Sequence, residues 1–330
     1  MGHYNHTNKH GISLAMAVFL LYDDYDYDDR PNAISATTLM RPLRQLVLSQ
    51  QNKELLKTVD ISDLVASCMG SAIHDRCERA WKSRENVSRA LKLFGASDSA
   101  IETVVINPTK PLLEGQIPVY VEQRTETVID GFIITGKYDI VLDGIVNDYK
   151  SGSVWGYIYD SNSKDYTEQG SIYKWLNPEK ITGDYINIQS IFTDWSKSAA
   201  RQDPKRYPQL RVLTKAYPVW GTEETEHWIK CKLEAYKQLA TAPQEMLPEC
   251  TDEELWASEP VYKYYKNPQK TVKSTKNFPT MDEAVARKHE DGDVGIVKTR
   301  PGEVKRCSYC PVEAICDQAR KLEREGRLNL

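Results

Sequence analysis

The chain has 330 residues, of which 40% are hydrophobic and 27% are charged, and this composition is typical of a soluble globular protein. The length is sufficient for one large domain or two modest domains. The formal net charge of −4 excludes a uniformly basic protein that coats nucleic acid, but it is compatible with a local basic groove.

Residues 1–30 are interpreted as a separate N-terminal segment. Its apolar run, residues 12–21, is too short to span a bilayer. The run lacks a small-residue cleavage site and is followed by the acidic stretch 22–29, so it differs from a signal peptide. We therefore expect a cytoplasmic protein without a membrane partner.

Residues 31–242 are interpreted as one α/β core, which opens with a helix in residues 33–50. Ser35 or Thr37 is expected to cap this helix. Residues 243–330 are interpreted as a C-terminal region, because a Lys/Tyr stretch and a cysteine cluster give them a different character.

A second helix is predicted in residues 61–83, where apolar residues recur with helical spacing. His74 lies on this helix one turn after Gly70, whose missing side chain leaves room for a metal or a phosphate. A histidine in such a position is ordinarily a core or surface residue, so its role depends on the strands that follow. The apolar stripe consists of Leu64, Val65, Met69, Ile73, Cys77, Ala80 and Trp81.

Three strands are predicted in residues 117–150, joined by the two-residue turns Asp130-Gly131 and Asp143-Gly144. Counting outward from the second turn puts Asp139 opposite Asp148 and Lys137 opposite Lys150. Counting outward from the first turn puts Glu122 opposite Asp139. A bulge at Gly136, or a slip of one residue, would undo the pairing of Glu122.

One register therefore sets the carboxylates of Glu122, Asp139 and Asp148 in a row across three strands. Directly opposed side chains have Cβ atoms about 4.5–5.5 Å apart, so these charges repel one another. A divalent cation compensates this repulsion, and oxygen ligands suit Mg²⁺ or Mn²⁺. Lys150 projects from the same face as Asp148. The alternative is a solvated hairpin face with scattered charges.

A helix predicted in residues 164–177 carries Gln169 and Tyr173 four residues apart, and hence on one face. An amide and a phenol so placed can contact a DNA backbone or orient Lys150. Residues 185–193 are predicted to form a further strand and residues 222–242 an amphipathic helix. Between them, the polar loop after Trp195 is interpreted as an ordinary surface loop, in preference to a site that stacks bases.

The stretch Tyr262–Lys276 has five Lys, three Tyr and no acidic residue. Positive charge interleaved with aromatic side chains suits single-stranded DNA, because bases stack on the rings and phosphates pair with the ammonium groups. Lys263, Lys266 and Lys270 are the DNA-binding candidates in this stretch. The alternative is a solvated, charged face.

Cys307, Cys310 and Cys316 form a C-x2-C-x5-C cluster, whose three thiolates suit zinc or an iron–sulfur cluster. The total of seven cysteines is odd, which favours metal ligation in a reducing compartment over a disulfide framework. Cys250 is the preferred fourth ligand, because the remaining cysteines fall on predicted helix faces. The alternative is a set of free cysteines. The cysteines that fall on predicted helix faces are Cys68, Cys77 and Cys231.

Together these motifs resemble the PD-(D/E)xK nuclease superfamily, and within it the RecB-type exonuclease branch. That branch includes the AddB nuclease domain, CRISPR adaptation exonucleases and phage exonucleases. Tyr138 stands where the superfamily has proline, and Arg41 stands where the branch has a further cluster cysteine. Either the cysteine site is incomplete or Cys250 completes it. The resemblance is carried by Gly70-x-x-x-His74, Gly136-Lys-Tyr-Asp139, Asp148-Tyr-Lys150, Gln169-x-x-x-Tyr173 and the cysteine cluster.

The resemblance implies a restriction-endonuclease-like fold, with a mixed sheet flanked by helices and a cysteine-clamped C-terminal region. It implies a Mg²⁺- or Mn²⁺-dependent deoxyribonuclease, most simply an exonuclease in DNA recombination, repair or phage DNA processing. DNA is the implied partner, with recombination or replication proteins beside it, and the location is the host cytoplasm if a phage encodes the chain. The alternatives are a structure-specific or restriction-type endonuclease and a non-catalytic DNA-binding recombination partner.

The family's roles transfer to matching positions in this chain. Lys150 assists the attacking water, and Glu122 contributes directly or through a water. The implied ligands of the catalytic metal are His74, Asp139, Asp148 and the Tyr149 carbonyl. The implied ligands of a [4Fe–4S] cluster, or of Zn²⁺, are Cys250, Cys307, Cys310 and Cys316.

Overall fold

The computed structural model describes residues 5–23, 28 and 30–329, so most of the acidic stretch 22–29 lies outside the described residues. The chain divides into two compact units. The first comprises Met1–Arg41 and Lys57–Ala235, and the second comprises Pro42–Leu56 and Tyr236–Leu330. Residues 42–56, which the sequence groups with the core, thus cluster with the C-terminal region.

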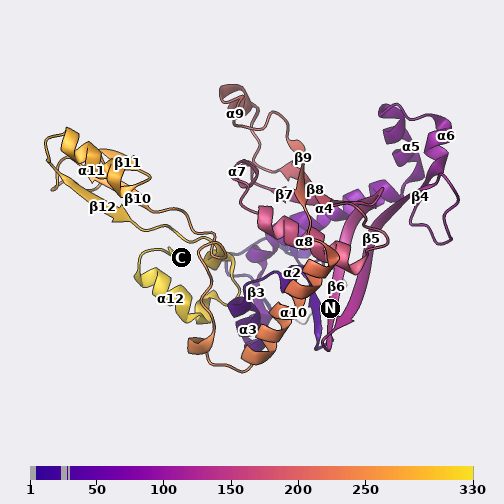
Figure 1. The fold of residues 1–330 in the computed structure, drawn as a ribbon, viewed down its shortest axis with the longest axis horizontal. Helices are drawn as coiled ribbons and strands as arrows, with labels where there is room; N and C mark the ends of the chain where they lie inside the picture. The colour runs from indigo at the N-terminus through magenta and orange to yellow at the C-terminus, as the bar shows by residue number, and fades with distance from the viewer. Residues whose placement is uncertain (1–4, 24–27, 29, 330) are drawn as a thin grey trace. The chain divides into compact units, whose positions relative to one another are not determined.

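A mixed sheet forms the centre of the first unit (Figure 1). Its strand order is β4-β5-β6-β7-β8-β9. β2 pairs with the N-terminal part of β6, away from the turn that joins β6 to β7. Three of the neighbouring pairs, β5–β6, β6–β7 and β8–β9, are antiparallel, whereas β7–β8 is parallel. This mixed sheet flanked by helices is the restriction-endonuclease-like α/β fold that the sequence predicts. The strands are β2 (Ala33–Ser35), β4 (Val104–Ile106), β5 (Ile117–Ile129), β6 (Phe132–Leu142), β7 (Ile145–Gly152), β8 (Tyr185–Phe192) and β9 (Val212–Pro218).

The two hairpin turns are confirmed. Asp130-Gly131 and Asp143-Gly144 all have φ between 49° and 81°. Such positive φ at both central residues is the signature of the tight type I′ turn, which matches the twist of the flanking strands. The two loops therefore fix the register that the sequence predicts. The pairs that close the hairpins are Ile129–Phe132 and Leu142–Ile145.

β6 and β7 are joined by the Asp143-Gly144 turn and separate a short distance beyond it. Their ladder ends at the pair Ile140–Asn147, after which β7 continues along β8 and β6 reaches β2. Asp139 and Asp148 stand immediately past the last pair, at the fork between the strands. The predicted pairing of Lys137 with Lys150 is therefore wrong, because the two strands have already diverged.

The β5–β6 ladder is interrupted at Glu122, whose φ is +52°. The register is the same on both sides of the interruption, with Val121 opposite Ile140 and Gln123 opposite Tyr138. Gly136, the position named for a possible bulge, is regularly paired.

Helix α8 (Ser163–Leu176) is packed tightly on one face of the sheet. A Cβ added to Gly136 would lie 2.6 Å from Leu176 Cδ1, and one added to Gly170 would lie 2.8 Å from Ile186 Cγ2. These two glycines allow the helix and strands to approach closely. The position of Gln169 and Tyr173 is fixed by this contact.

Helix α4 (Val65–Lys82) contacts β5 and β7 on the other face. Its Trp81 packs in a cluster with Val119, Val121 and Ile140. No residue of α4 is fully buried, and Val65 and Met69 are more than 40% exposed. The predicted apolar stripe is thus covered only in part. Residues 61–64 of the predicted helix form a 3₁₀ turn.

The predicted helix of residues 33–50 is divided at Arg41-Pro42. Ser35 caps the first piece by accepting a hydrogen bond from Thr38 N–H. The predicted helices of residues 164–177 and 222–242 are confirmed as α8 and α10. The other helices that the first unit contributes are α1 (Leu14–Leu20), α2 (Ala36–Leu39), α5 (Arg84–Leu93), α6 (Asp98–Thr103), α7 (Val154–Ile158), α9 (Lys197–Gln202) and most of α10 (Thr222–Leu239), with a strand pair β1 (Asn5–Thr7) and β3 (Thr58–Asp60).

The second unit has its own apolar core, in which Val47 and Leu48 of α3 pack with Leu255, Val304 and Leu322. A small antiparallel sheet in the order β11-β10-β12 adjoins α11. None of the helices in the described residues is long and apolar enough to cross a membrane. The elements of this unit are α3 (Leu43–Gln51), β10 (Val261–Tyr265), β11 (Lys276–Phe278), α11 (Met281–Glu290), β12 (Ile296–Arg300) and α12 (Asp317–Arg324).

The Lys/Tyr stretch of residues 262–276 begins with β10. Tyr264 is fully buried and Tyr265 is 6% exposed, so neither ring is available to stack on a base. The prediction that Tyr264 and Tyr265 stack on bases is therefore wrong, because these two residues face opposite sides of β10 and both sides are covered, whereas Tyr262 is only partly buried. Lys266 and Lys270 are exposed, and their role in DNA binding stays a prediction.

Candidate active site

Side chains from five elements line one cavity of about 470 Å³ in the first unit. His74 comes from α4 and Gln169 from α8, which pack on opposite faces of the sheet. Both reach the same cavity because β6 and β7 have separated at this point. The lining residues are Ser71, His74, Asp75, Glu78, Glu122, Arg124, Lys137, Asp139, Asp148, Lys150, Gln169 and Tyr173.

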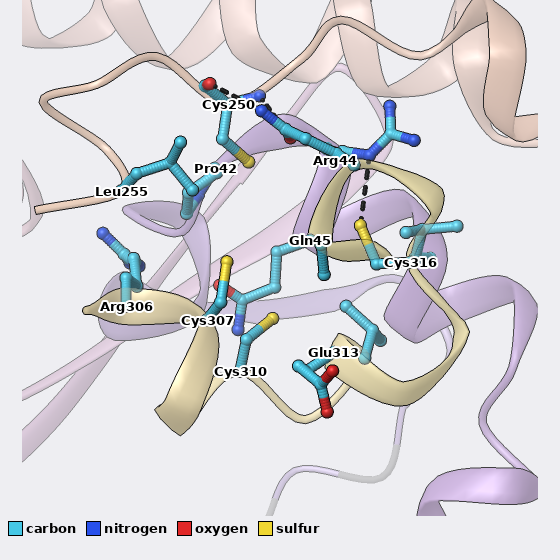
Figure 2. Close-up of a pocket in the computed structure, with 14 residues that line it drawn as sticks. Pro42, Arg44, Gln45, Cys250, Leu255, Arg306, Cys307, Cys310, Glu313 and Cys316 are labelled. Carbon is cyan, nitrogen blue, oxygen red and sulfur yellow. Dashed lines mark hydrogen bonds between the residues drawn. The ribbon is translucent and has the colours of Figure 1, made fainter. Parts of the chain in front are cut away.

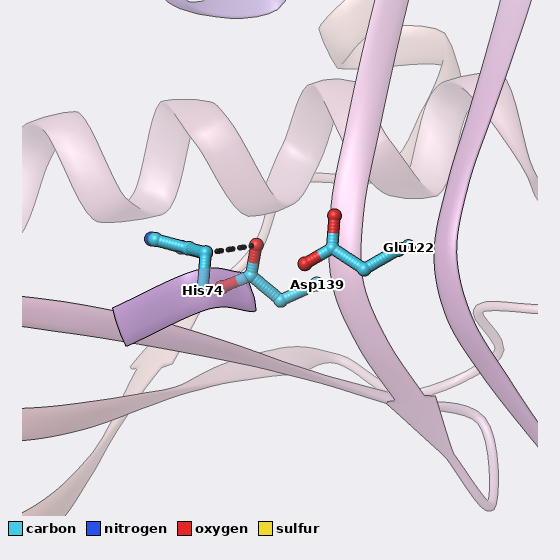
Figure 3. A group of neighbouring side chains, drawn as sticks. All are labelled: His74, Glu122 and Asp139. Carbon is cyan, nitrogen blue, oxygen red and sulfur yellow. Dashed lines mark ion pairs between the residues drawn. The ribbon is translucent and has the colours of Figure 1, made fainter. Parts of the chain in front are cut away.

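His74, Glu122 and Asp139 form a group of potential metal ligands (Figure 3). One ligand atom from each lies within 4.8 Å of the others, and His74 Nδ1 is 3.1 Å from Asp139 Oδ1. The Glu122 carboxylate points toward that of Asp139. One imidazole nitrogen and two carboxylates are a donor set that fits a divalent metal ion.

The backbone orients Asp139. Its Oδ2 accepts a 2.7 Å hydrogen bond from Tyr149 N–H, which the divergence of β6 and β7 leaves facing this carboxylate. The hydrogen bond to Asp139 raises the pKa of His74, although burial opposes the rise. In the absence of a metal the imidazole therefore tends toward its charged form, which partly balances the carboxylates.

Asp148 is 1% exposed. Lys150 Nζ lies 2.5 Å from its Oδ2, and Gln169 Nε2 donates to its Oδ1 at 3.3 Å. The same Gln169 nitrogen is 2.8 Å from the Tyr173 hydroxyl. The ion pair with Lys150 is close, but Oδ2 accepts no hydrogen bond of suitable geometry. A buried carboxylate oxygen in this condition fits a cation ligand.

The electrostatics of this ion pair follow from burial. Burial raises the pKa of Asp148 to about 6, although the charge of Lys150 opposes the rise. Burial lowers the pKa of Lys150, but the charges of Asp148 and Asp139 outweigh it, so the net pKa is raised. A raised pKa favours the charged form of Lys150, which can orient a water or stabilise negative charge.

Glu122 is held in a strained backbone conformation, because a positive φ is uncommon for a residue with a side chain. Its Oε2 lies 2.6 Å from Lys137 Nζ. Burial raises the pKa of Glu122, and the hydrogen bond from Lys137 opposes the rise. The strain is located where the β5–β6 ladder breaks, and it directs this carboxylate toward Asp139.

Sequence reasoning did not assign a role to Arg124 and Lys137. They form a directly opposed pair across β5 and β6 and line the cavity beside the carboxylates. Glu78, which also lines the cavity, lies one helical turn after His74, so the spacing of α4 could have found it. Arg124 and Lys137 could have been found by counting outward from the Asp130-Gly131 turn, as was done for Glu122.

Seven of the predicted site residues are thus brought together in one cavity: His74, Glu122, Asp139, Asp148, Lys150, Gln169 and Tyr173. Gln169 and Tyr173 are both about 5% exposed or less, and Gln169 contacts a carboxylate. Their contact with DNA stays a prediction, as does metal ligation by the Tyr149 carbonyl. The donor set and the buried Asp148 oxygen show that these residues fit a divalent metal.

The four predicted cluster cysteines line one pocket of the second unit together with Arg44 (Figure 2). Burial raises the pKa of Cys250 to about 12 and that of Cys307 to about 11, so these groups are neutral thiols without a metal. Cys316 Sγ accepts a 3.4 Å hydrogen bond from Arg44 Nε. Within the described residues, the four sulfurs are not gathered as closely as the ligand atoms of His74, Glu122 and Asp139.

No protein-family model matches the sequence, and no curated protein matches it. The structure is similar to the crystal structure of SSO0001, with 17% identity, a TM-score of 0.38, and coverage of 71% of this chain and 94% of that chain. It is also similar to the crystal structure of a phage related exonuclease from Haemophilus somnus 129PT, with 17% identity, a TM-score of 0.29, and coverage of 63% and 93% respectively. At these values neither likeness bears on function.

Proposed function

We propose that this protein is a metal-dependent DNA exonuclease that hydrolyses phosphodiester bonds. The observation that carries the proposal is the fork between β6 and β7. There His74, Glu122 and Asp139 form one ligand group beside the buried pair of Asp148 and Lys150. Three acidic residues, a histidine and a lysine in one cavity are components suited to metal-assisted hydrolysis.

His74, Asp139 and Asp148 would hold one or two Mg²⁺ or Mn²⁺ ions, with Glu122 joining directly or through a water. A metal bound there lowers the pKa of a water and neutralises charge that develops on the phosphate. Lys150 would orient the attacking water or stabilise that charge. Gln169 holds the Asp148 carboxylate in position through its 3.3 Å hydrogen bond.

DNA is the proposed substrate, and Lys263, Lys266 and Lys270 are proposed to contact its backbone. The hydrolysis would serve DNA recombination, repair or phage DNA processing in the cytoplasm. Recombination or replication proteins are the proposed further partners.

In the second unit, Cys250, Cys307, Cys310 and Cys316 would hold a structural [4Fe–4S] cluster or Zn²⁺. The thiols must lose their protons on binding, so metal binding and the folding of this pocket are coupled.

The test uses end-labelled linear DNA and closed circular DNA, single- and double-stranded, in Mg²⁺, in Mn²⁺ and in EDTA. We expect metal-dependent loss of the linear forms alone, abolished in Lys150→Ala. The matched control is Lys174→Ala, because Lys174 pairs with Asp184 and does not line the cavity. Cutting of the circles would establish an endonuclease instead. DNA binding without cleavage in either metal would contradict the catalytic proposal and leave a DNA-binding protein.

A further inference from the structure

The short helix α7 and the residue that follows it present two aromatic side chains to solvent. Trp155 is 49% exposed and Tyr159 is 64% exposed. Their rings are stacked, with centroids 6.0 Å apart and planes inclined by 24°. Large aromatic side chains are ordinarily buried in good part, so a stacked and exposed pair calls for a ligand with a flat, apolar face.

The pair is supported from behind. Tyr207, which is only 9% exposed, packs edge-on against Trp155 at a centroid distance of 6.3 Å. Its hydroxyl accepts a 2.9 Å hydrogen bond from Ser196 N–H. Arg206 lies 5.5 Å from the Tyr159 ring centroid and donates a 3.0 Å hydrogen bond to the Tyr159 hydroxyl. The exposed rings are therefore held in place before any ligand arrives.

The segment that follows β8 is basic although the chain as a whole has a net charge of −4, and Asp160, beside Tyr159, is paired with Lys215 of this segment. Residues 195–217 contain six cationic side chains and one acidic side chain. Three of the cations lie within 6 Å of aromatic ring centroids, so positive charge and aromatic faces are interleaved here. The cations are Lys197, Arg201, Lys205, Arg206, Arg211 and Lys215, and the acid is Asp203.

This surface continues directly from the catalytic strand. β7 carries Lys150, ends at Gly152, and leads into α7, whose first turn is capped by Ser153. β8 runs parallel to β7, so the C-terminal ends of the two strands lie side by side. The segment after β8, which holds the cations, therefore begins next to α7. Asp194 joins the two segments by accepting hydrogen bonds from the Ser153 hydroxyl and from Val154 N–H.

We propose that Trp155, Tyr159 and Arg206 form a platform on which bases of single-stranded DNA stack while the strand is held near the catalytic cavity. The inference rests on the proposed nuclease function and names its substrate class. Every unpaired base offers a face to an aromatic ring, whereas a duplex hides all base faces except those of its terminal pairs. The cations beside the rings are suited to the phosphates of the same strand.

Binding is measured by fluorescence anisotropy in EDTA, so that no cleavage occurs, with labelled oligo(dT) and with a duplex of the same length. We expect Trp155→Ala and Tyr159→Ala each to weaken oligo(dT) binding about 5- to 150-fold, the range for one base stacked on one ring. Trp155→Phe should retain most of the affinity. The matched control is Tyr185→Ala, because Tyr185 is 41% exposed but lies at the opposite end of β8.

The proposal fails if the wild type does not bind oligo(dT), or if both alanine variants bind it as the wild type does. It also fails if duplex binding falls equally, if Tyr185→Ala has the same effect, or if oligo(rU) binds as tightly as oligo(dT). These outcomes are independent of cleavage. A protein that cleaves DNA with an unimportant platform would overturn the platform alone, whereas a protein that binds oligo(dT) on the platform without cleaving would overturn the nuclease alone.

Discussion

The carboxylate cavity of the first unit and the cysteine pocket of the second unit are two candidate metal sites built on opposite principles. In the cavity, the ligands are already gathered, and cationic partners balance their charges: Lys137 at Glu122 and Lys150 at Asp148. In the pocket, burial keeps the thiols of Cys250 and Cys307 neutral, and no such balance is required. The first site can therefore exist without its metal, whereas the second must change its protonation to bind one.

This difference separates two kinds of dependence on metal. Loss of the cavity's metal should remove chemistry and leave the fold, because the protein's own cations neutralise the carboxylates. Loss of the pocket's metal should lower the free energy of unfolding, because the cysteines are then no longer held together by a shared metal.

The largest effect is expected from Asp139→Ala. This change removes the carboxylate that joins His74 to the backbone of β7, so we expect cleavage to fall by about 10³-fold or more. The midpoint of thermal unfolding should change little. The measurement is the initial rate of loss of end-labelled DNA in Mg²⁺, beside a melting curve. Asp184→Ala, at a side chain that is 92% exposed, is the control that should retain full activity.

The converse is expected from Cys250→Ser. If Cys250 is the fourth ligand, its loss should reduce the metal content of the second unit and lower the free energy of unfolding by about 3 kcal/mol. Metal analysis and urea denaturation measure the two effects. Cys231→Ser is the matched control, because Cys231 is exposed and lies on α10 outside the pocket. A Cys250 variant with the metal content and stability of the wild type would show that another group completes the site.

Asp148→Asn should stabilise the metal-free protein. Because burial raises the folded-state pKa of Asp148 to about 6, the folded protein binds this proton more tightly than the unfolded chain does. The resulting stability is fully present below the ordinary aspartate pKa of 3.8 and is lost as the pH rises through about 6. In EDTA at pH 7 we therefore expect the variant to be more stable by about 1–3 kcal/mol.

The gain from Asp148→Asn should vanish near pH 4, where the wild-type carboxyl is also neutral. Lys150, Asp139 and His74 are the charged groups that act on Asp148, and all three are present in both proteins. Urea denaturation at the two pH values measures the difference. Equal stability at both pH values would mean that the ion pair with Lys150 fully compensates the burial of the charge.

The contrast also explains how far the sequence could predict each site. The cavity depends on local rules: two tight turns fix a register, and the register brings Glu122 to Asp139 and Asp139 to Asp148. The divergence of β6 and β7 could not be predicted, because it depends on strands that are distant in sequence. Beyond the last β6–β7 pair, β6 pairs with β2 and β7 pairs with β8. The positive φ of Glu122 arises where that twisted ladder breaks, and no local residue preference indicates it.

In the pocket, the spacing of Cys307, Cys310 and Cys316 predicts a shared site, but the fourth member depends on tertiary packing alone. Arg44 could not be found from the sequence, since it reaches the pocket from α3 and donates to Cys316 across a separation of 272 residues. The same limit applies to the Lys/Tyr stretch. The composition of this stretch suits base stacking, but tertiary packing on both sides of β10 buries Tyr264 and Tyr265, while exposed rings lie at Trp155 and Tyr159.

The smallest effect is expected from Gly70→Ala, and it tests whether a ligand uses the open space beside Gly70. A Cβ at Gly70 would meet no protein atom within 4 Å, so alanine in this helix should stabilise the protein by about 0.5–1 kcal/mol. If DNA or metal-bound water uses the space, KM for DNA should rise while the stability also rises. Gly136→Ala is the informative counterpart, because its Cβ would collide with Leu176 and should destabilise the fold by about 1–3 kcal/mol. Unchanged KM in Gly70→Ala would show that the glycine serves neither the fold nor the substrate.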